Sequence, residues 1–288
     1  MKLISYTEGR ISTAGAVRDG RAIPLAPFFG RRETEIGIED VIAVWPESRS
    51  AIARFVEREE GAVPLDSVRL LAPLRRPQKI VAIGSNYPRP GGAVGPAGSP
   101  VLFFKPPSAL VGPYDPIALP PEAQTVVGEV ELAIVIGMAG ERIEPAAAAD
   151  HIFGYMVAND VTAPEIMLGE SAKNPLFLQQ SRGKGFKTFC PTGPWIETGQ
   201  GMPFPPVWEL QQDVGEYREM HGSTRQMITG IAELLADVSC AFGLEAGDIV
   251  LTGSPPPIGG KRRPLIPGTT LRSSISGIGR LANPIVQG

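Results

Sequence analysis

The sequence predicts a β-rich α+β fold, with a small N-terminal domain over residues 1–72 and a larger domain over residues 73–288. Glycine and proline account for 34 and 30 of the 288 residues without any repeat, which indicates many turns between short strands. Most apolar runs are about four to eight residues long, the usual length of strands. Only two segments have the spacing of apolar residues that is typical of a helix.

The N-terminal part begins with the alternating stretch KLISYTEGRISTAGAVRDGRAIPL. Glu-Gly at 8–9 and Asp-Gly at 19–20 are turn signals, so this stretch is predicted to form hairpins. The segment IEDVIAVWPESRSAIARFVERE follows and places Ile52, Phe55 and Val56 on one side of a helix. We therefore expect hairpins and one helix in the small domain.

The larger domain opens at RRPQKIVAIGSNY and contains several strand-like segments: KIVAI, VLFF, ELAIVIG, IFGYMVAND, GPWIETG and DIVLTGS. One helix is predicted over residues 224–243, where apolar residues recur at helical intervals and Gly243 marks the end. The larger domain is therefore dominated by strands.

Two glutamates begin the apolar segment VVGEVELAIVIG. Glu129 and Glu131 are two residues apart, so on a strand their side chains point to the same face. Both faces are apolar further along, as in a buried strand, where unpaired carboxylates are costly. Asp160 ends another apolar run and adds a third acid. Three converging carboxylates suit a hard divalent ion such as Mg²⁺; the alternative is a solvated strand end whose acids pair with arginines.

Composition excludes several classes of function. The formal net charge of −3 argues against a nucleic-acid partner or an anionic membrane. No apolar run approaches the roughly 20 residues that span a bilayer, and the first ten residues do not read as a signal peptide. Two cysteines are too few for a disulfide framework or a cysteine zinc site, and there are only two histidines. The cytoplasm is the expected location.

Three further features are weaker on their own. Lys184 lies among glycines and aromatic residues in QQSRGKGFKTFCPTGPW, which fits either a catalytic or a surface lysine. Thr252 and the backbone N–H groups of LTGSPPPIGG offer an anion site, although most such turns are only turns. His221 in EMHGST is expected to be exposed at a hairpin tip.

Together these segments resemble the fumarylacetoacetate hydrolase superfamily. The resemblance runs from about Lys79 to Pro284 and is carried by FFKPPSALVGPYDPI, GEVELAIVIG, IFGYMVANDVTA, QQSRGKGFKTFCPTGPW, LEAGDIVLTGSP and ISGIGRLANPI. It implies a mixed β-sandwich roll, a homodimer, a small-molecule substrate, and Mg²⁺ or Mn²⁺ at the active site. The residues it implies are Glu129, Glu131 and Asp160 for the metal, Lys184 and Lys105 for catalysis, and Tyr87, Gln179, Arg182, Thr252, Gly253 and Ser254 for the substrate.

The stretch GSNYPRPGGAVGPAGSP, residues 84–100, departs from the family pattern. Hydrolases of the family carry G-x-N-Y-x-x-H-x-x-E here, with a histidine and a glutamate that activate water. This chain keeps Gly84, Asn86 and Tyr87 but has no histidine or acid as far as Pro100, and its prolines and glycines exclude a helical lid. Arg89 is expected to attract a substrate carboxylate instead. The metal residues survive, whereas the hydrolytic residues do not.

Three functions follow from this pattern. The first is a metal-dependent lyase or isomerase that acts on a 2-oxo acid or 1,3-dicarbonyl through a metal-stabilised enolate, by decarboxylation, tautomerisation, dehydration or cyclisation. The second is a C–C hydrolase of an acylpyruvate-type substrate that takes its base from elsewhere, for example His221 of a partner subunit. The third is a non-catalytic binding relative. Retention of the three acids and Lys184 argues against the third, and loss of the lid residues argues against the second.

Overall fold

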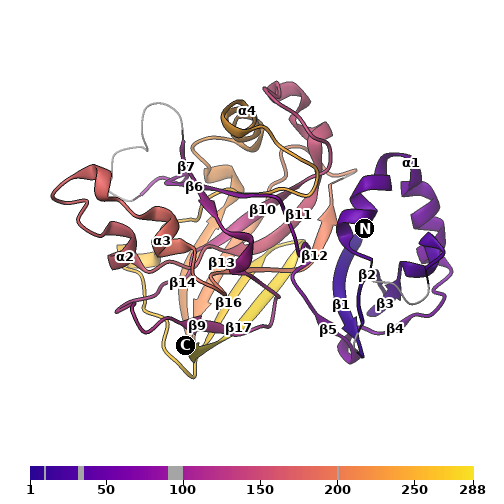
Figure 1. The fold of residues 1–288 in the computed structure, drawn as a ribbon, viewed down its shortest axis with the longest axis horizontal. Helices are drawn as coiled ribbons and strands as arrows, with labels where there is room; N and C mark the ends of the chain where they lie inside the picture. Colours follow the sequence, from indigo (N-terminus) through magenta and orange to yellow (C-terminus); the bar gives the residue numbers. More distant parts are fainter. Residues whose placement is uncertain (10, 32–35, 90–99, 200) are drawn as a thin grey trace.

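The structure is a computed structural model, and it describes residues 1–9, 11–31, 36–89, 100–199 and 201–288. Two β-sheets form the larger part of the molecule, and the N-terminal elements gather at one end of it (Figure 1). Both sheets are mixed, because a few parallel pairs interrupt their antiparallel ladders. The prediction of a β-rich α+β fold with a mixed β-sandwich is confirmed.

The large sheet runs through both predicted domains. Its strands follow the order β4 (Val63–Pro64), β3 (Arg21–Pro24), β2 (Ile11–Arg18), β1 (Lys2–Glu8), β12 (Cys190–Thr198), β11 (Ile152–Asn159), β10 (Val130–Ile136), β15 (Ile249–Leu251), β6 (Ile80–Gly84) and β7 (Val101–Lys105). Beside this path, β5 (Arg69–Leu70) pairs with β1, and β8 (Leu110–Val111) pairs with β12.

The second sheet has five strands in the order β14 (Tyr217–Ser223), β13 (Glu209–Val214), β16 (Thr270–Ile275), β17 (Gly279–Gln287) and β9 (Ile117–Leu119). The α-helices are α1 (Ile38–Glu57), α2 (Pro164–Leu168), α3 (Gln180–Lys184) and α4 (Ile231–Phe242). No helix of the described residues is long and apolar enough to cross a membrane.

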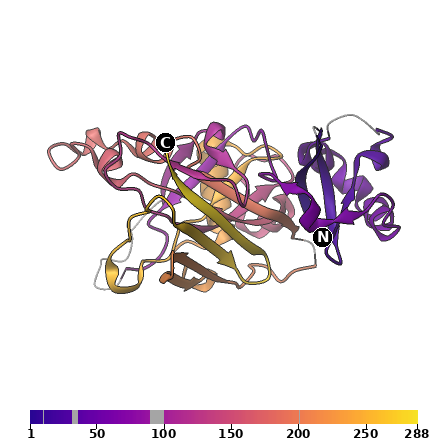
Figure 2. The same ribbon diagram turned by 90° about the horizontal axis from the view of Figure 1, so that it is seen from below.

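The N-terminal part has the predicted hairpins and helix. β1 pairs with β2, β2 pairs with β3, and α1 buries one face that includes Ile52 and Val56. β1 also pairs with β12 of the larger part, with Leu3 opposite Ile196. Figure 2 shows the N-terminal group again at one end of the molecule. The large sheet therefore contains strands from both sides of residue 72. The division into domains of residues 1–72 and 73–288 stays a prediction.

Strand β10 lies at the centre of the core. All seven of its residues are buried, as the apolar pattern on both of its faces predicted. Ala133 and Val135 pack into the core cluster that includes α1, whereas Leu132 and Ile134 pack into the cluster that includes α4 and the second sheet. Burial on both faces holds this strand, which carries Glu131 and directly follows Glu129, in the middle of the core.

Two predictions about local structure are wrong. The helix predicted from residue 224 begins only at Ile231, because the N–H groups of Ile228 and Thr229 donate to Asn86 and the chain stays extended at Gly230. Its predicted end at Gly243 is confirmed. His221 lies within β14 rather than at a hairpin tip, since the turn falls between Val214 and Tyr217. It is exposed, as expected, and lies 3.4 Å from Glu209.

Candidate active site

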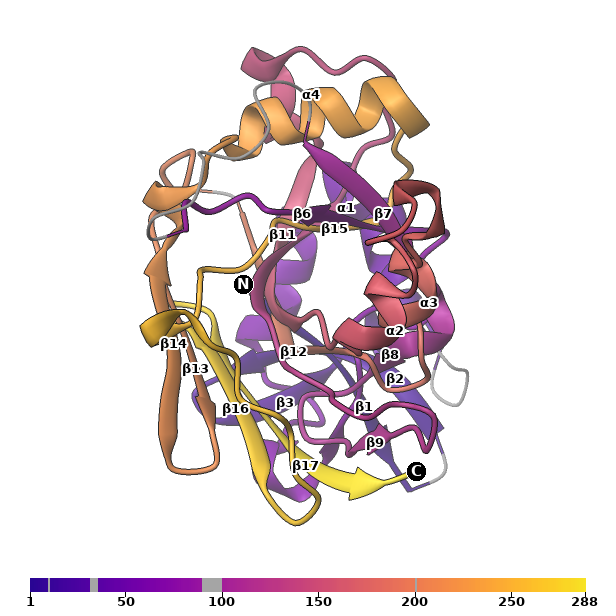
Figure 3. The same cartoon turned by 90° about the vertical axis from the view of Figure 1, so that its left-hand side faces the viewer.

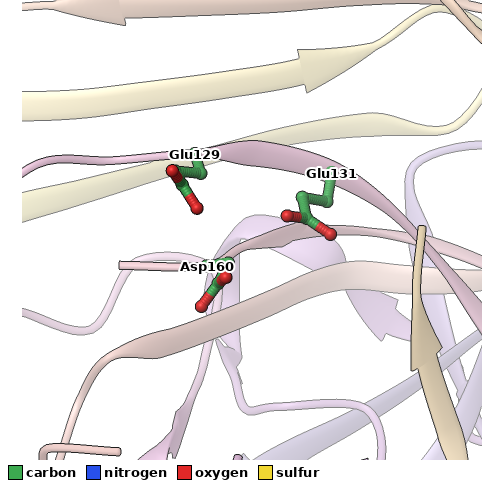
Figure 4. A group of neighbouring side chains, drawn as sticks. All are labelled: Glu129, Glu131 and Asp160. Atoms are coloured by element: carbon green, nitrogen blue, oxygen red, sulfur yellow. The ribbon is translucent and has the colours of Figure 1, made fainter. Parts of the chain in front are cut away.

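Strand pairing brings the three predicted acids together. β10 and β11 are antiparallel, with Val130 opposite Asn159, so the start of one strand lies beside the end of the other. Glu129 immediately precedes β10, and its carbonyl accepts the N–H of Asp160 at 2.9 Å. Glu129, Glu131 and Asp160 each offer a carboxylate oxygen, and these oxygens all lie within 4.8 Å of one another (Figure 4). The three predicted acids thus lie together, and their role as metal ligands stays a proposal.

Two buried lysines face this acid cluster. Lys184 ends α3, and its Nζ donates to Glu129 at 2.7 Å, to Asp160 at 2.5 Å and to the Thr162 hydroxyl at 2.7 Å. Lys105 ends β7, and its Nζ donates to the other oxygen of Asp160 at 2.6 Å and to the carbonyl of Lys184. Figure 3 shows α2 and α3 side by side next to the β6–β7 edge of the large sheet. Both predicted lysines therefore contact the acids.

Glu129 has a second cationic partner, and Glu131 is held by a backbone N–H group. Arg262 lies 2.8 Å from Glu129, and it also donates to the carbonyl of Gly128 at 3.0 Å. Glu131 accepts the N–H of Gly253 at 2.7 Å. Gly253 has a φ of 90°, which favours glycine and turns the chain so that its N–H points at the carboxylate.

The electrostatics of the cluster divide the acids into two kinds. Burial raises the pKa of Glu131 well above its ordinary value, and repulsion from Asp160 and Glu129 adds to the rise. Burial also acts to raise the pKa of Asp160, but Lys105 and Lys184 outweigh it and hold that pKa below its usual range. For Lys184, attraction by Asp160 and Glu129 outweighs burial and raises the pKa of the ammonium. Lys184 therefore stays charged at neutral pH.

The acids open into a cavity of about 220 Å³. Its apolar wall consists of Ile83, Val101, Phe103, Met167, Leu178 and Pro256. Tyr87 lines it too, and its buried hydroxyl has no hydrogen-bond partner among the residues that the structure describes. Burial and the nearby Glu131 raise the pKa of Tyr87, so its hydroxyl remains a donor at neutral pH. The described residues of this lining include no histidine.

Asn86 fixes the start of the predicted loop. Its side-chain amide donates to the carbonyls of Thr229 and Thr252 and accepts the N–H of Thr229 at 2.9 Å. Tyr87 follows directly and is thereby held at the cavity. Residues 90–99 of the loop lie outside the described residues, but their sequence, PGGAVGPAGS, contains no ionisable side chain. This part of the loop has no side chain that could serve as a general base.

The other predicted substrate residues are divided between two places. Arg89 and Ser254 line the acidic cavity, but the hydroxyl of Thr252 is buried and donates to the carbonyl of Leu132. Gln179 and Arg182 line a neighbouring cavity of about 870 Å³ instead. The geometry therefore gives no support to a substrate role for the side chains of Gln179, Arg182 and Thr252.

Three polar residues of the cavity, Ser85, Gln180 and Arg262, were missed by the sequence reasoning, although Ser85 lies in the loop singled out there. Gln180 lies four residues before Lys184 on α3, so the two share a helix face, and this i, i+4 spacing is a signal that could have been used. Arg262 lies in the run KRRP, and nothing in that run tells which arginine turns inward.

The residues present fit a divalent metal ion. Three carboxylates supply the hard oxygen ligands that Mg²⁺ and Mn²⁺ prefer. The Tyr87 hydroxyl is buried beside them without a partner in the described part of the chain, and a substrate or ordered water in the cavity would satisfy it. Burial and repulsion from the neighbouring acids raise the pKa of Glu131, and a bound cation would favour its ionised form by offsetting both effects.

Comparison with known proteins agrees with this geometry. Residues 79–286 match the family described as "Fumarylacetoacetate (FAA) hydrolase C-terminal". The chain is 37% identical over 243 residues to the mitochondrial oxaloacetate tautomerase FAHD2B of Bos taurus, which covers 82% of this chain and 76% of the relative. Two solved structures match all of the chain. A probable 2-hydroxyhepta-2,4-diene-1,7-dioate isomerase from Mycobacterium abscessus has 33% identity, a TM-score of 0.80 and 99% coverage. Maleylpyruvate hydrolase from Sphingobium sp. SYK-6, solved with manganese(II) and pyruvate, has 29% identity, a TM-score of 0.82 and full coverage.

Proposed function

The chain belongs to the fumarylacetoacetate hydrolase family, and from this membership we propose that it is a divalent-metal-dependent enzyme that interconverts the keto and enol forms of a small 2-oxo acid. The observation that carries the proposal is the pairing of a complete three-carboxylate site with a lining whose described residues include no histidine. Relatives named as a tautomerase and an isomerase support the reaction class.

The charge of the site favours an anionic substrate. Glu129, Glu131 and Asp160, when ionised, are balanced by Lys105, Lys184 and Arg262, and Arg89 in the cavity lining adds one positive charge. A divalent cation bound there makes this small, partly apolar cavity strongly positive. Such a cavity attracts a dianion of the oxaloacetate type more strongly than a neutral ketone.

The metal, held by the three acids, would supply Lewis-acid stabilisation of the negative charge that develops on a 2-oxo acid as it enolises. The protein contributes fixed donors around the same position. Tyr87 remains a neutral phenol and can donate to the developing oxyanion, whereas the three N–H donors of Lys184 are taken by Glu129, Asp160 and Thr162, so Lys184 contributes its positive charge. Arg89 at the exposed end of the cavity is placed to bind a substrate carboxylate.

A second candidate is hydrolysis of a C–C bond, favoured by the match of the whole chain to maleylpyruvate hydrolase. This reaction needs a base to activate water. His221 is exposed on β14 and is not among the described residues that line the acidic cavity, so within one chain it does not supply that base. We therefore place hydrolysis second.

Product analysis in ¹⁸O-labelled water separates the two candidates. The Mg²⁺-loaded enzyme is incubated with an acylpyruvate, and the released carboxylic acid is examined by mass spectrometry. We expect no enzyme-dependent cleavage. A carboxylic acid that forms with enzyme and carries ¹⁸O would instead establish the hydrolase.

We further propose that the chain acts as a homodimer in the cytoplasm and that Mg²⁺ or Mn²⁺ is its metal. Exposed apolar side chains between α2 and α3 support an interface there, with Leu176 exposed by 85% and Phe177 by 48%. Sedimentation at micromolar concentration tests this proposal, and a stable monomer would contradict it.

A further inference from the structure

A row of buried polar side chains connects the second sheet to the acid cluster. Glu219 on β14, Gln212 on β13, Ser273 on β16 and Asn159 on β11 are each at most 2% exposed. Burying four polar side chains in one place is costly unless each of them is hydrogen-bonded. This row ends at the backbone of Glu129, so its arrangement bears on the proposed metal site.

The hydrogen bonds of the row all run in one direction. Glu129 donates its backbone N–H to Oδ1 of Asn159 at 2.9 Å, and Nδ2 of Asn159 donates to Oε1 of Gln212 at 2.6 Å and to the hydroxyl of Ser273 at 2.8 Å. Nε2 of Gln212 then donates to Oε2 of Glu219 at 2.7 Å. An N–H donor at one end and a carboxyl oxygen at the other thus fix which way both amides face.

A second arm connects the same two glutamates. The other oxygen of Glu219 accepts the backbone N–H of Arg263. The preceding residue, Arg262, pairs with the Glu129 carboxylate at 2.8 Å and donates to the carbonyl of Gly128. Glu219 is therefore connected to the backbone of Glu129 through the two amides, and to its carboxylate through the Arg262 loop.

We propose that Glu219 is a positioning residue of the active site, which sets the place and orientation of the metal-binding carboxylate of Glu129 through these two arms. This inference rests on the proposed metal site and extends it to residues that touch neither metal nor substrate. Outer partners of this kind orient metal ligands, and their replacement weakens metal binding by about 10- to 100-fold.

The polarity of the row makes the proposal testable with nearly isosteric variants. In Glu219→Gln the new NH₂ group must face an N–H donor, either that of Gln212 or that of Arg263, so one arm is lost. In Gln212→Glu the new carboxyl oxygen faces that of Glu219, and the two repel. In the double variant Glu219→Gln, Gln212→Glu, the amide and the carboxyl exchange places, and every hydrogen bond of the row is restored.

The experiment measures Mn²⁺ affinity by calorimetry for the parent, both single variants and the double variant, together with the melting temperature of each. We expect each single variant to bind Mn²⁺ about 10-fold or more weakly, and the double variant to return to within about threefold of the parent. Glu209→Gln is the matched control, because it makes the same change at an exposed residue of the same sheet; its affinity should equal that of the parent.

Single variants that stay folded and bind Mn²⁺ like the parent would overturn the proposal. So would a double variant that is unfolded or remains as weak as the singles. If the single variants yield too little folded protein, Gln212→Met interrupts the row without adding a carboxyl, and parent-like affinity in that variant contradicts the proposal equally. A parent that binds Mn²⁺ but lacks turnover contradicts the proposed function and leaves this inference standing, whereas a parent that binds no Mn²⁺ contradicts both.

Discussion

Glu131 is the acid of the site whose ionised form most needs a neighbouring cation. The residue is 2% exposed, its carboxylate lies beside two other acids, and its one described hydrogen bond comes from the N–H of Gly253. Burial and the neighbouring acids raise its pKa, so the metal-free protein keeps Glu131 protonated at pH values above the ordinary carboxyl range of about 4.3. Metal binding requires the ionised form and must release that proton.

Mn²⁺ affinity should therefore rise with pH until the raised pKa of Glu131 is passed, and then level off. Below that point each unit of pH costs up to about tenfold in Kd. Calorimetry in buffers of different ionisation enthalpy measures the protons released on binding. Glu131→Gln should bind more weakly and release fewer protons. An affinity in the parent that does not change between about pH 5 and pH 8, with no proton released, would show that Glu131 is not the titrating ligand.

The proposed role of Lys184 differs from that of the acids. It donates hydrogen bonds to Glu129 and Asp160, and an ammonium group has no lone pair with which to bind a metal. In Lys184→Met the chain length is kept and the charge is lost. We expect kcat to fall by about 100-fold or more while Mn²⁺ binds at least as tightly, since a competing cation has been removed. Loss of metal binding in this variant would mean that Lys184 mainly holds the acids in place.

At the scale of elements, we propose that the start of the loop after β6 shapes access to the cavity. Asn86 ties this segment to Thr229 and Thr252, and Arg89 lies exposed at the cavity three residues later. Arg89→Ala should raise KM for a dianionic substrate by about tenfold and change kcat less, because it removes binding of a carboxylate away from the reacting carbonyl. Arg225→Ala, a change at another exposed arginine, serves as control. An effect confined to kcat would contradict this role.

Some elements of the site could be predicted from the sequence, and others could not. The apolar residues on both faces of β10 marked a buried strand, and the acids at its start marked the site. Periodicity cannot tell that β11 is its neighbour, or that Arg262 rather than Arg263 turns inward, because these depend on contacts distant in sequence. Around α3 the prediction chose Gln179, which precedes the helix, and Arg182, whereas the helix face that carries Lys184 presents Gln180.

At the scale of the whole molecule, the N-terminal part is joined to the larger part by more than a linker. β1 pairs with β12, and one core cluster contains both Leu3 and Ile23 from the N-terminal part and Ile80 and Ala133 from the rest. A fragment of residues 73–288 would expose the edge of β12 and half of that cluster. We expect it to aggregate or to melt well below the intact chain. A monodisperse fragment with the melting temperature of the parent would show that the larger part folds alone.

The central claim is that the acid cluster, loaded with a divalent metal, enolises a 2-oxo acid. The most direct measurement is the rate of keto–enol interconversion of oxaloacetate, followed by NMR, for the Mg²⁺-loaded parent, the metal-free parent and Glu131→Ala. The account predicts acceleration by the loaded parent only, with the carbon skeleton of the substrate intact. Equal acceleration by all three samples, or none by the loaded parent while it binds Mg²⁺, would contradict the account.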